Sequence, residues 1–153
     1  MSLRNRIIGG ALATSMLIAT PFIAKHEGLR NLAYFDQVKK PTICYGSTAG
    51  VRMGDYKTTK ECDALLQKEV EQFMRDVDAL ILIPVKPNVL AALTSWAYNV
   101  GMTNVKSSTL LKKLNAGDIA GACRELPRWV YAKGKKLNGL VKRRQEEMEL
   151  CLQ

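Results

Sequence analysis

Two carboxyl side chains and one hydroxyl side chain lie close together near the start of the chain. Glu27 is followed nine residues later by Asp36, and Thr42 comes six residues after Asp36. Two carboxyl groups that flank a sugar can hydrolyse a glycosidic bond, because one protonates the leaving oxygen while the other supports water or the developing cation. The three residues are therefore candidates for glycoside hydrolysis.

The spacing alone is a weak signal, because 14 acidic residues among 153 produce many such pairs by chance. Most carboxylates are solvated surface charges. Asp36 could instead cap the turn of a hairpin, and Thr42 could be an ordinary strand residue. The sequence around these residues has to decide between the alternatives.

The surrounding residues form a series of motifs that resembles the phage lysozymes, the T-even-type endolysins of glycoside hydrolase family 24. The resemblance covers about residues 25–152. It rests on the following runs, in this order: Glu27-Gly28-Leu29-Arg30, Ala33-Tyr34-Phe35-Asp36, Thr42-Ile43-Cys44-Tyr45-Gly46, Trp96-Ala97-Tyr98-Asn99-Val100-Gly101, Ser108-Thr109-Leu110-Leu111, Gly121-Ala122-Cys123, Arg128-Trp129-Val130-Tyr131-Ala132, and Gly139-Leu140 with Arg143, Arg144 and Glu147.

The resemblance implies an endolysin, a muramidase that hydrolyses the β-1,4 bond between N-acetylmuramic acid and N-acetylglucosamine in bacterial peptidoglycan during host lysis. Glu27 would be the general acid, Asp36 the ionised carboxylate that stabilises the transition state and positions water, and Thr42 a hydrogen-bond partner of that water. No metal and no organic cofactor is expected, because this chemistry needs neither.

Softer expectations concern the sugar cleft and its surroundings. Tyr45, Asn99 and the loop 102–107, with Ser107, are expected to line the cleft, whereas Trp129 and Arg143 are expected to pack the helical lobe. The family commonly has a histidine directly after the Thr…Gly motif, where this chain has Ser47. We expect that departure to affect support of the hairpin.

Two other functions remain to be weighed against hydrolysis. A lytic transglycosylase would use one glutamate and yield an anhydro-sugar, and the presence of Asp36 and Thr42 argues against it. A non-enzymatic cationic protein that disrupts membranes would still kill cells after Glu27→Gln.

Positive charge suggests an anionic partner. The formal net charge is +9, and residues 128–144 contain seven Lys or Arg residues and no acid. Aromatic residues within this stretch could indicate nucleic-acid binding, but no helix-turn-helix, zinc-finger or RNA-binding signature accompanies them. We expect a surface that helps to hold the acidic cell wall, no nucleic-acid partner, and a monomer.

Residues 7–24 form 18 uncharged positions between Arg6 and Lys25. As a helix they would span about 27 Å, slightly less than a hydrocarbon core of about 30 Å. Half are Gly, Ala, Ser or Thr, and Pro21 should interrupt or kink the last turn. The segment is therefore a marginal membrane span, and Arg4 and Arg6 would keep the N-terminus cytoplasmic.

Three interpretations of this segment compete. A cleaved signal peptide fits poorly, because Phe22 would occupy a small-residue position and Glu27 would lie on a frayed new terminus. A buried helix of a soluble protein is the second. We favour the third, a signal anchor at residues 1–24 before a catalytic domain at 25–153, as in the signal-anchor-release endolysins. Such a chain is first held inactive in the host inner membrane and then released, active, into the periplasm.

The patterns predict an α+β, lysozyme-like fold, with a small β subdomain and a mainly helical lobe joined by a long helix. Residues 25–30 should end a first helix, and residues 32–57 should form a hairpin or a three-stranded sheet. Thr58 and Glu61 form a capping box for the long helix, which should end before Pro84. Further helices are expected at about 88–100, 108–114, after Asp118 as far as Pro127, and 140–150. A cleft between the two parts would bring the three candidates to one wall.

The four cysteines contain no C-x-x-C pair, and His26 is the only histidine, so a zinc site is not expected. In an oxidising compartment an even number favours disulfides, with three possible connectivities. We favour Cys44–Cys62 and Cys123–Cys151, because each pair joins neighbouring elements. His26 is expected at the surface.

Overall fold

The computed structural model describes the backbone of residues 3–153 and the side chains of residues 11–153. The side chains of Arg4 and Arg6, and of residues 7–10 of the predicted anchor, lie outside this description. Helix α1 runs unbroken for 25 residues, Leu3–Glu27, and crosses residue 24. It ends at Gly28, which adopts the left-handed conformation with φ 74° and donates its N–H to the carbonyl of Ala24 at 3.1 Å.

Pro21 does not interrupt α1, so the interruption considered from the sequence does not occur. A proline leaves the carbonyl of the residue four positions earlier without its helical donor, and that residue is Leu17. Both Pro21 and Leu17 are exposed, with Leu17 at 78%. Water can therefore satisfy the carbonyl at this face of the helix.

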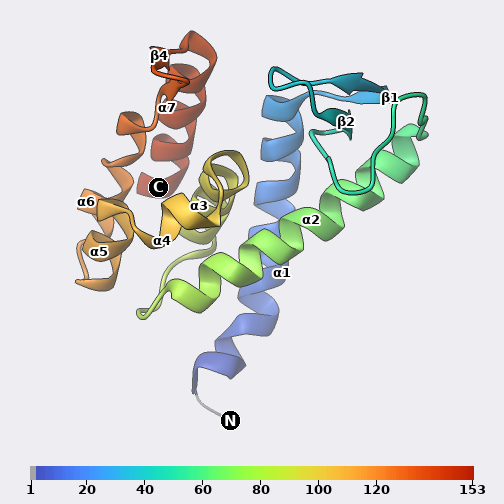
Figure 1. Ribbon diagram of the computed structural model, residues 1–153. Helices are drawn as coiled ribbons and strands as arrows, with labels where there is room; N and C mark the ends of the chain where they lie inside the picture. Colours follow the sequence, from blue (N-terminus) through green and yellow to red (C-terminus); the bar gives the residue numbers. More distant parts are fainter. Residues whose placement is uncertain (1–2) are drawn as a thin grey trace.

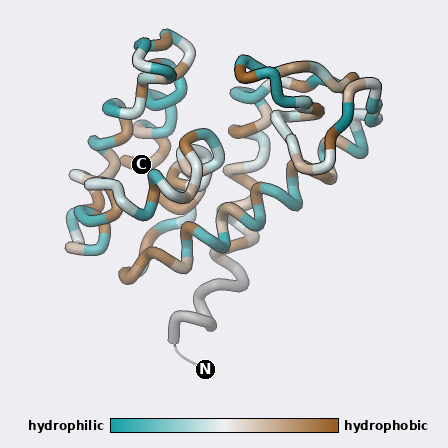
Figure 2. Tube along the Cα trace, viewed as in Figure 1, coloured by the Kyte–Doolittle hydropathy of each residue, from teal (hydrophilic) through white to brown (hydrophobic). Residues whose placement is uncertain are grey.

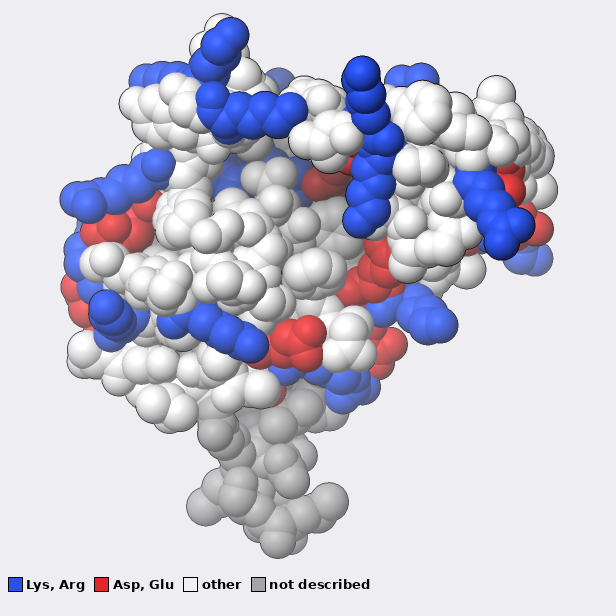
Figure 3. All heavy atoms as spheres, viewed as in Figure 1, with Lys and Arg blue, Asp and Glu red and all other residues white. Residues whose placement is uncertain are grey.

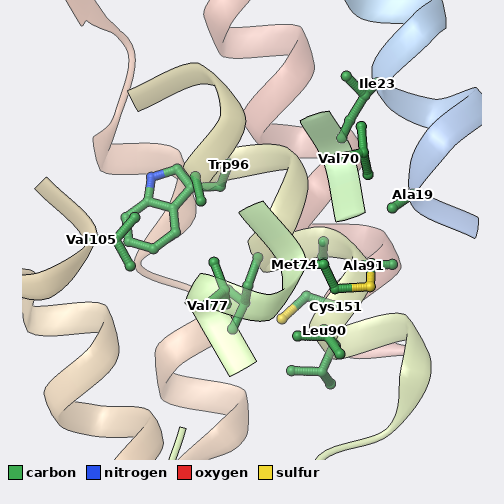
Figure 4. Close-up of a cluster of buried hydrophobic side chains, with 14 of the residues drawn as sticks. Ala19, Ile23, Val70, Met74, Val77, Leu90, Ala91, Trp96, Val105 and Cys151 are labelled. Carbon is green, nitrogen blue, oxygen red and sulfur yellow. The ribbon is translucent and has the colours of Figure 1, made fainter. Parts of the chain in front are cut away.

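The opposite face of α1 is part of the protein core. Ser15, Ala19 and Ile23, four residues apart, are fully buried, and Figure 4 shows Ala19 and Ile23 beside Val70. The hydroxyl of Ser15 donates to the carbonyl of Ala11 at 2.6 Å, so its burial leaves no donor unpaired. Burial of a side chain such as Ile23 contributes roughly 1.5–3 kcal/mol. Across the described part of the chain, no helix combines the length and apolar character needed to cross a bilayer.

The β subdomain is a two-stranded hairpin, and the three-stranded alternative does not form. Strands β1 (Arg30–Phe35) and β2 (Pro41–Cys44) are antiparallel, with Tyr34 opposite Thr42. Isolated bridges join Leu32 to Tyr56 and Ile43 to Ser47. The second bridge closes a tight turn directly after β2, close to the end of α1.

Helix α2 (Thr59–Leu80) is the long connecting helix, and its capping box is present. The Thr58 hydroxyl accepts from the Glu61 N–H at 3.1 Å, and the Glu61 carboxylate accepts from the Thr58 N–H at 3.0 Å. Hydrophilic and hydrophobic residues alternate along α2 in Figure 2, as an amphipathic helix requires. Its buried positions are Cys62, Leu66, Val70, Met74 and Val77.

The helical lobe is built around α3 (Pro87–Val100), whose residues 89–97 are all buried. Figure 1 shows α2 running from this lobe to the hairpin, and α1 ending beneath β1 and β2. The other elements of the lobe are α4 (Met102–Lys106), α5 (Thr109–Asn115), α6 (Ile119–Cys123), a 3₁₀ helix (Leu126–Arg128), β3 (Tyr131–Ala132), β4 (Lys135–Lys136) and α7 (Asn138–Leu152). The expected α+β, lysozyme-like architecture is confirmed.

Two local expectations were wrong, and one short element was missed. Residues 102–106, expected in a loop, form α4. The basic stretch contains a small hairpin, β3–β4, that the sequence pattern did not reveal. Helix α6 ends at Cys123, and Pro127 lies inside the 3₁₀ helix instead of terminating α6. All three errors concern elements shorter than two helical turns, for which periodicity carries little information.

Two disulfides stabilise the fold, with the pairing that the sequence favoured. Cys44–Cys62 joins the end of β2 to the first turn of α2, and Cys123–Cys151 joins α6 to α7. The first bridge closes 18 residues and the second 28. Loops of this size correspond to roughly 3 kcal/mol each in the chain-entropy model.

Candidate active site

Glu27 is the last residue of α1 and is held by an arginine from the far end of the chain. Oε1 of Glu27 accepts from Nη1 of Arg143 at 2.6 Å, and the Glu27 side chain is 20% exposed. The other oxygen, Oε2, faces Gly46, where an added Cβ would lie 3.4 Å from it. Gly46 has φ 96°, so both its backbone and its small size suit this close approach. The carboxyl group is thus fixed from two sides at a partly accessible position.

Asp36 lies at the end of β1 and stabilises the turn that follows. Its Oδ1 accepts from the N–H of Val38 at 2.9 Å and of Lys40 at 2.8 Å. These bonds fix the orientation of the carboxyl group while its other oxygen, Oδ2, stays outside the turn. Asp36 therefore caps the turn of the hairpin, as considered from the sequence, and it does so through Oδ1 alone.

Thr42 lies on β2 with its side chain buried. Its Oγ1 donates to the carbonyl of Lys40 at 2.9 Å. Because the hydroxyl proton is committed to Lys40, Oγ1 can interact with a water molecule only as an acceptor. That orientation leaves the lone pair of the water oxygen free to attack.

Arg143 packs in the helical lobe, as the sequence analysis expected, and it also contacts Glu27. Its side chain is 5% exposed, and its Nε lies 3.1 Å from Oε1 of Glu147. Nη2 of Arg143 donates to the carbonyl of Ser95 at 3.1 Å. The spacing of Arg143, Arg144 and Glu147 on one predicted helix indicated that these three side chains lie close together, because residues three and four apart meet on a helix surface.

The same buried cluster continues to Asn99. Nε of Arg144 lies 3.0 Å from Oε2 of Glu147, and Nη2 of Arg144 donates to Oδ1 of Asn99 at 2.7 Å. Burial lowers the pKa of Arg144 to about 10, and Glu147 opposes that shift. Burial also raises the pKa of Glu147, against the attraction of Arg144 and Arg143.

Two tyrosines support the site from the side of α2. The hydroxyl of Tyr98 donates towards the carbonyl of Tyr45 at 3.1 Å and Oε2 of Glu69 at 3.2 Å. Burial, followed by the nearby charges of Glu69 and Glu27, raises the pKa of Tyr98. Tyr98 therefore remains a protonated donor at neutral pH.

A cavity of about 390 Å³ lies between the hairpin subdomain and the helical lobe. It is lined by Gln37, which directly follows Asp36, together with Asn99, Val100, Asn104, Trp129, Tyr131, Ala132, Leu137 and Leu140. Figure 3 shows a hollow in this face of the molecule, with both Lys or Arg atoms and Asp or Glu atoms visible inside it and further Lys and Arg side chains around it. Nζ of Lys133 reaches the carbonyl of Gln37 at 3.3 Å, so the β3–β4 hairpin contacts the turn after β1.

Of Tyr45, Asn99 and Ser107 only Asn99 lines this cavity, although Asn104 contributes to it from the expected 102–107 loop. Tyr45 is nearly buried and donates its hydroxyl to Oδ1 of Asp63 at 2.6 Å. Ser107 caps the end of α4, where its hydroxyl donates to the carbonyl of Thr103 at 3.3 Å. Tyr45 and Ser107 are therefore better described as framework residues, because their polar groups are already engaged. Trp129, expected to be structural, both lines the cavity and packs edge-on against Trp96.

His26 is not a surface residue, so that expectation was also wrong. Its side chain is 10% exposed, and Nε2 lies 2.8 Å from Oε2 of Glu146 on α7. Lys25 reaches the same oxygen at 2.9 Å. Burial, and then the positive charge of Arg143, lowers the pKa of His26, although Glu146 acts in the opposite direction.

Comparison with known proteins agrees with this fold. The phage lysozyme family model matches residues 24–147. The chain is 42% identical to the SAR-endolysin of Bacteriophage PS119 over 158 residues, covering 99% of this chain and 95% of that relative. The endolysin from Escherichia coli O157:H7 phage FAHEc1 superposes with a TM-score of 0.80 at 35% identity, over 88% of this chain and 90% of the other.

A third relative has been solved in two forms. The active form of P1 phage endolysin Lyz gives a TM-score of 0.80 at 27% identity, over 88% of this chain and 83% of that one. The secreted inactive form gives 0.52, over 68% and 74%. The present fold is thus more similar to the active form.

A hairpin subdomain and a helical lobe, with the Glu27 carboxyl group facing Gly46 of the first and bound by Arg143 of the second, define a lysozyme-like glycoside hydrolase. The chain belongs to the phage lysozyme family. It is an endolysin, a muramidase that acts on bacterial peptidoglycan in host cell lysis.

Proposed function

We propose that Glu27, Asp36 and Thr42 carry out hydrolysis of the β-1,4 bond between N-acetylmuramic acid and N-acetylglucosamine. The observation that carries this assignment is the fixed carboxyl group of Glu27, held by Arg143 and approached by Gly46 at the edge of the hairpin. Glu27 protonates the glycosidic oxygen as the bond breaks. The remaining oxygen of Asp36 stabilises the oxocarbenium-like transition state, and Thr42 accepts a hydrogen bond from the attacking water.

The test is digestion of purified peptidoglycan by the wild-type protein and by Glu27→Gln. The variant keeps the size of the side chain but has no proton to deliver, so we expect the rate to fall about 10²–10⁴-fold. Mass spectrometry should identify reducing sugar ends in the wild-type products. Anhydro-sugar ends would identify a lytic transglycosylase, and undiminished killing by Glu27→Gln would identify a membrane-disrupting protein.

We also propose that residues 7–24 first insert into the host inner membrane and later join the folded enzyme in the periplasm. The name SAR-endolysin of the PS119 relative supports this sequence of events. The burial of Ser15, Ala19 and Ile23 supports the second step, because these residues of the segment are part of the core of the folded enzyme. While the segment lies in the bilayer, α1 cannot pack on α2 and α3, so Glu27 lacks its support.

Two leucine substitutions separate membrane affinity from docking into the core. Ala19 is fully buried, whereas Ala13 on the same helix is exposed. Both Ala19→Leu and Ala13→Leu add the same apolar side chain, but only the first overpacks the core. We expect Ala19→Leu to leave more protein in the membrane fraction and less released activity than Ala13→Leu. Full activity of the membrane-bound form would contradict the proposal.

We propose further that the enzyme works as a monomer and that its basic surface favours the acidic wall without binding nucleic acid. Sedimentation should give the mass of one chain, 17.0 kDa. A steeply salt-dependent affinity for DNA would argue against the assignment of the basic surface to the wall.

A further inference from the structure

Glu147 on α7 is a buried carboxylate to which hydrolysis assigns no chemical step. Its side chain is 0% exposed, and its two oxygens contact two different arginines. Oε1 lies 3.1 Å from Nε of Arg143, and Oε2 lies 3.0 Å from Nε of Arg144. The hydroxyl of Ser95 on α3 donates to Oε1 at 2.7 Å, which fixes the carboxylate from a second helix.

The two arginines reach different parts of the active site. Nη1 of Arg143 donates to Oε1 of Glu27, and Nη2 of Arg144 donates to Oδ1 of Asn99 in the wall of the cavity. We propose that Glu147 is a positioning residue for hydrolysis, because it holds both guanidinium groups and thereby orients Glu27 and Asn99 together. This inference rests on the proposed role of Glu27 as the general acid.

Orientation of Asn99 follows from the same contacts. Its amide oxygen is occupied by Arg144, so the amide NH₂ is left to donate into the cavity. A donor there suits the carbonyl oxygens and hydroxyl groups of an N-acetylated sugar. Glu147 therefore acts on substrate binding through Arg144 as well as on proton transfer through Arg143.

The positive charges of the two arginines explain why a carboxylate is needed at position 147. Arg143 and Arg144 bring two positive charges close to Glu27, and two uncompensated cations would favour its ionised form, which cannot act as an acid. Glu147 offsets one of these charges without touching Glu27. Stability alone would not require such a cluster, because well-packed apolar residues often replace buried ion pairs without loss.

Glu147→Gln tests the inference, because it removes the charge while keeping the size and an acceptor oxygen. We expect the alkaline limb of the kcat/KM profile for peptidoglycan to move to lower pH by about one pH unit. We also expect kcat to fall about tenfold near neutral pH. Glu149→Gln is the matched control, because Glu149 is exposed on the same helix and the charge change is identical. Its profile should match the wild type.

Each outcome gives a decision. A Glu147→Gln profile with the wild-type shape and only a lower amplitude or a lower melting temperature would overturn the inference, because Glu147 would then be structural only. Glu147→Asp, which restores the charge, should return the alkaline limb towards its wild-type position. If Glu147→Gln does not fold, Ser95→Ala removes one hydrogen bond of the carboxylate and should lower kcat severalfold; unchanged kinetics would refute the positioning role. Activity of Glu27→Gln would instead refute the proposed function itself.

Discussion

Each of the three proposed catalytic residues has one polar group bound to the protein and another left over. Glu27 uses Oε1 for Arg143, Asp36 uses Oδ1 for the turn, and Thr42 uses its proton for Lys40. The bound group fixes the side chain, and the remaining group is left for the proposed reaction. Structural and catalytic interpretations of Asp36 and Thr42 are thus compatible, because different atoms of one side chain serve each role.

Gly46→Ala should impair catalysis more than it impairs folding. The substitution strains a backbone with φ 96° and places a methyl group 3.4 Å from Oε2 of Glu27. We expect the free energy of unfolding to fall by about 1 kcal/mol or more and kcat to fall by at least tenfold, as measured by denaturation and by peptidoglycan hydrolysis.

Gly54→Ala is the control for backbone strain. Gly54 has nearly the same φ, 95°, but an added Cβ would meet nothing within 4 Å. It should lose similar stability and keep its kcat. Equal losses of kcat in both variants would show that the approach of Gly46 to Glu27 is unimportant.

Among the helices and strands, those with a long hydrophobic periodicity or a capping motif could be predicted from the sequence. The capping box of Thr58 and Glu61 marked the start of α2 at the correct residue, because its two bonds join residues only three apart. The continuity of α1 was less predictable. The free-energy cost of Pro21 in a helix depends on whether water can reach the carbonyl of Leu17, which the sequence does not show. Elements α4 and β3–β4 were missed because two to five residues carry no usable period.

Thr58→Ala should destabilise the protein without changing its chemistry. Loss of an N-cap costs about 1 kcal/mol, and α2 carries the hairpin on which Asp36 and Thr42 lie. Urea denaturation should show this loss, while kcat at low temperature stays within about twofold of the wild type. Thr103→Ala, at an exposed helical threonine, should leave stability within about 0.5 kcal/mol. An equal loss at both positions would mean that the cap is not the cause.

For the whole molecule, the contacts between α1 and α7 are decisive. Lys25 and His26 meet Glu146, and Glu27 meets Arg143, so three consecutive residues are fastened to the C-terminal helix. Residues more than a hundred positions apart thereby support the general acid. The same contacts make the stability of the enzyme dependent on the docking of α1.

Stability should fall on acidification below the ordinary His26 pKa of 6.5. The pKa of His26 is lowered in the fold, chiefly by burial and then by Arg143. Between 6.5 and that lower value, the unfolded chain binds a proton that the folded chain does not, so the free energy of unfolding rises with pH in this window. The pKa of Glu146 is also lowered, first by the hydrogen bond from Lys25, so its contribution is lost at still lower pH.

Denaturation midpoints measured between about pH 5 and pH 7.5 should show this slope, and His26→Asn should flatten it. The comparison is direct, because His26 is the only histidine in the chain. An unchanged slope in His26→Asn would assign the pH dependence to other groups.

The sequence by itself determined the family, the order of the longer elements and the candidates Glu27, Asp36 and Thr42, and it favoured the disulfide pairing that the fold adopts. These follow from residue types and from the order and spacing of motifs along the chain. Only the tertiary structure decided that Arg143 contacts Glu27, that the His26 side chain is largely covered, that Asn99 lines the cavity whereas Tyr45 and Ser107 do not, and that Ser15, Ala19 and Ile23 belong to the core. Those facts depend on the packing of α1 against α3 and α7, and no local pattern encodes a contact between residues 27 and 143.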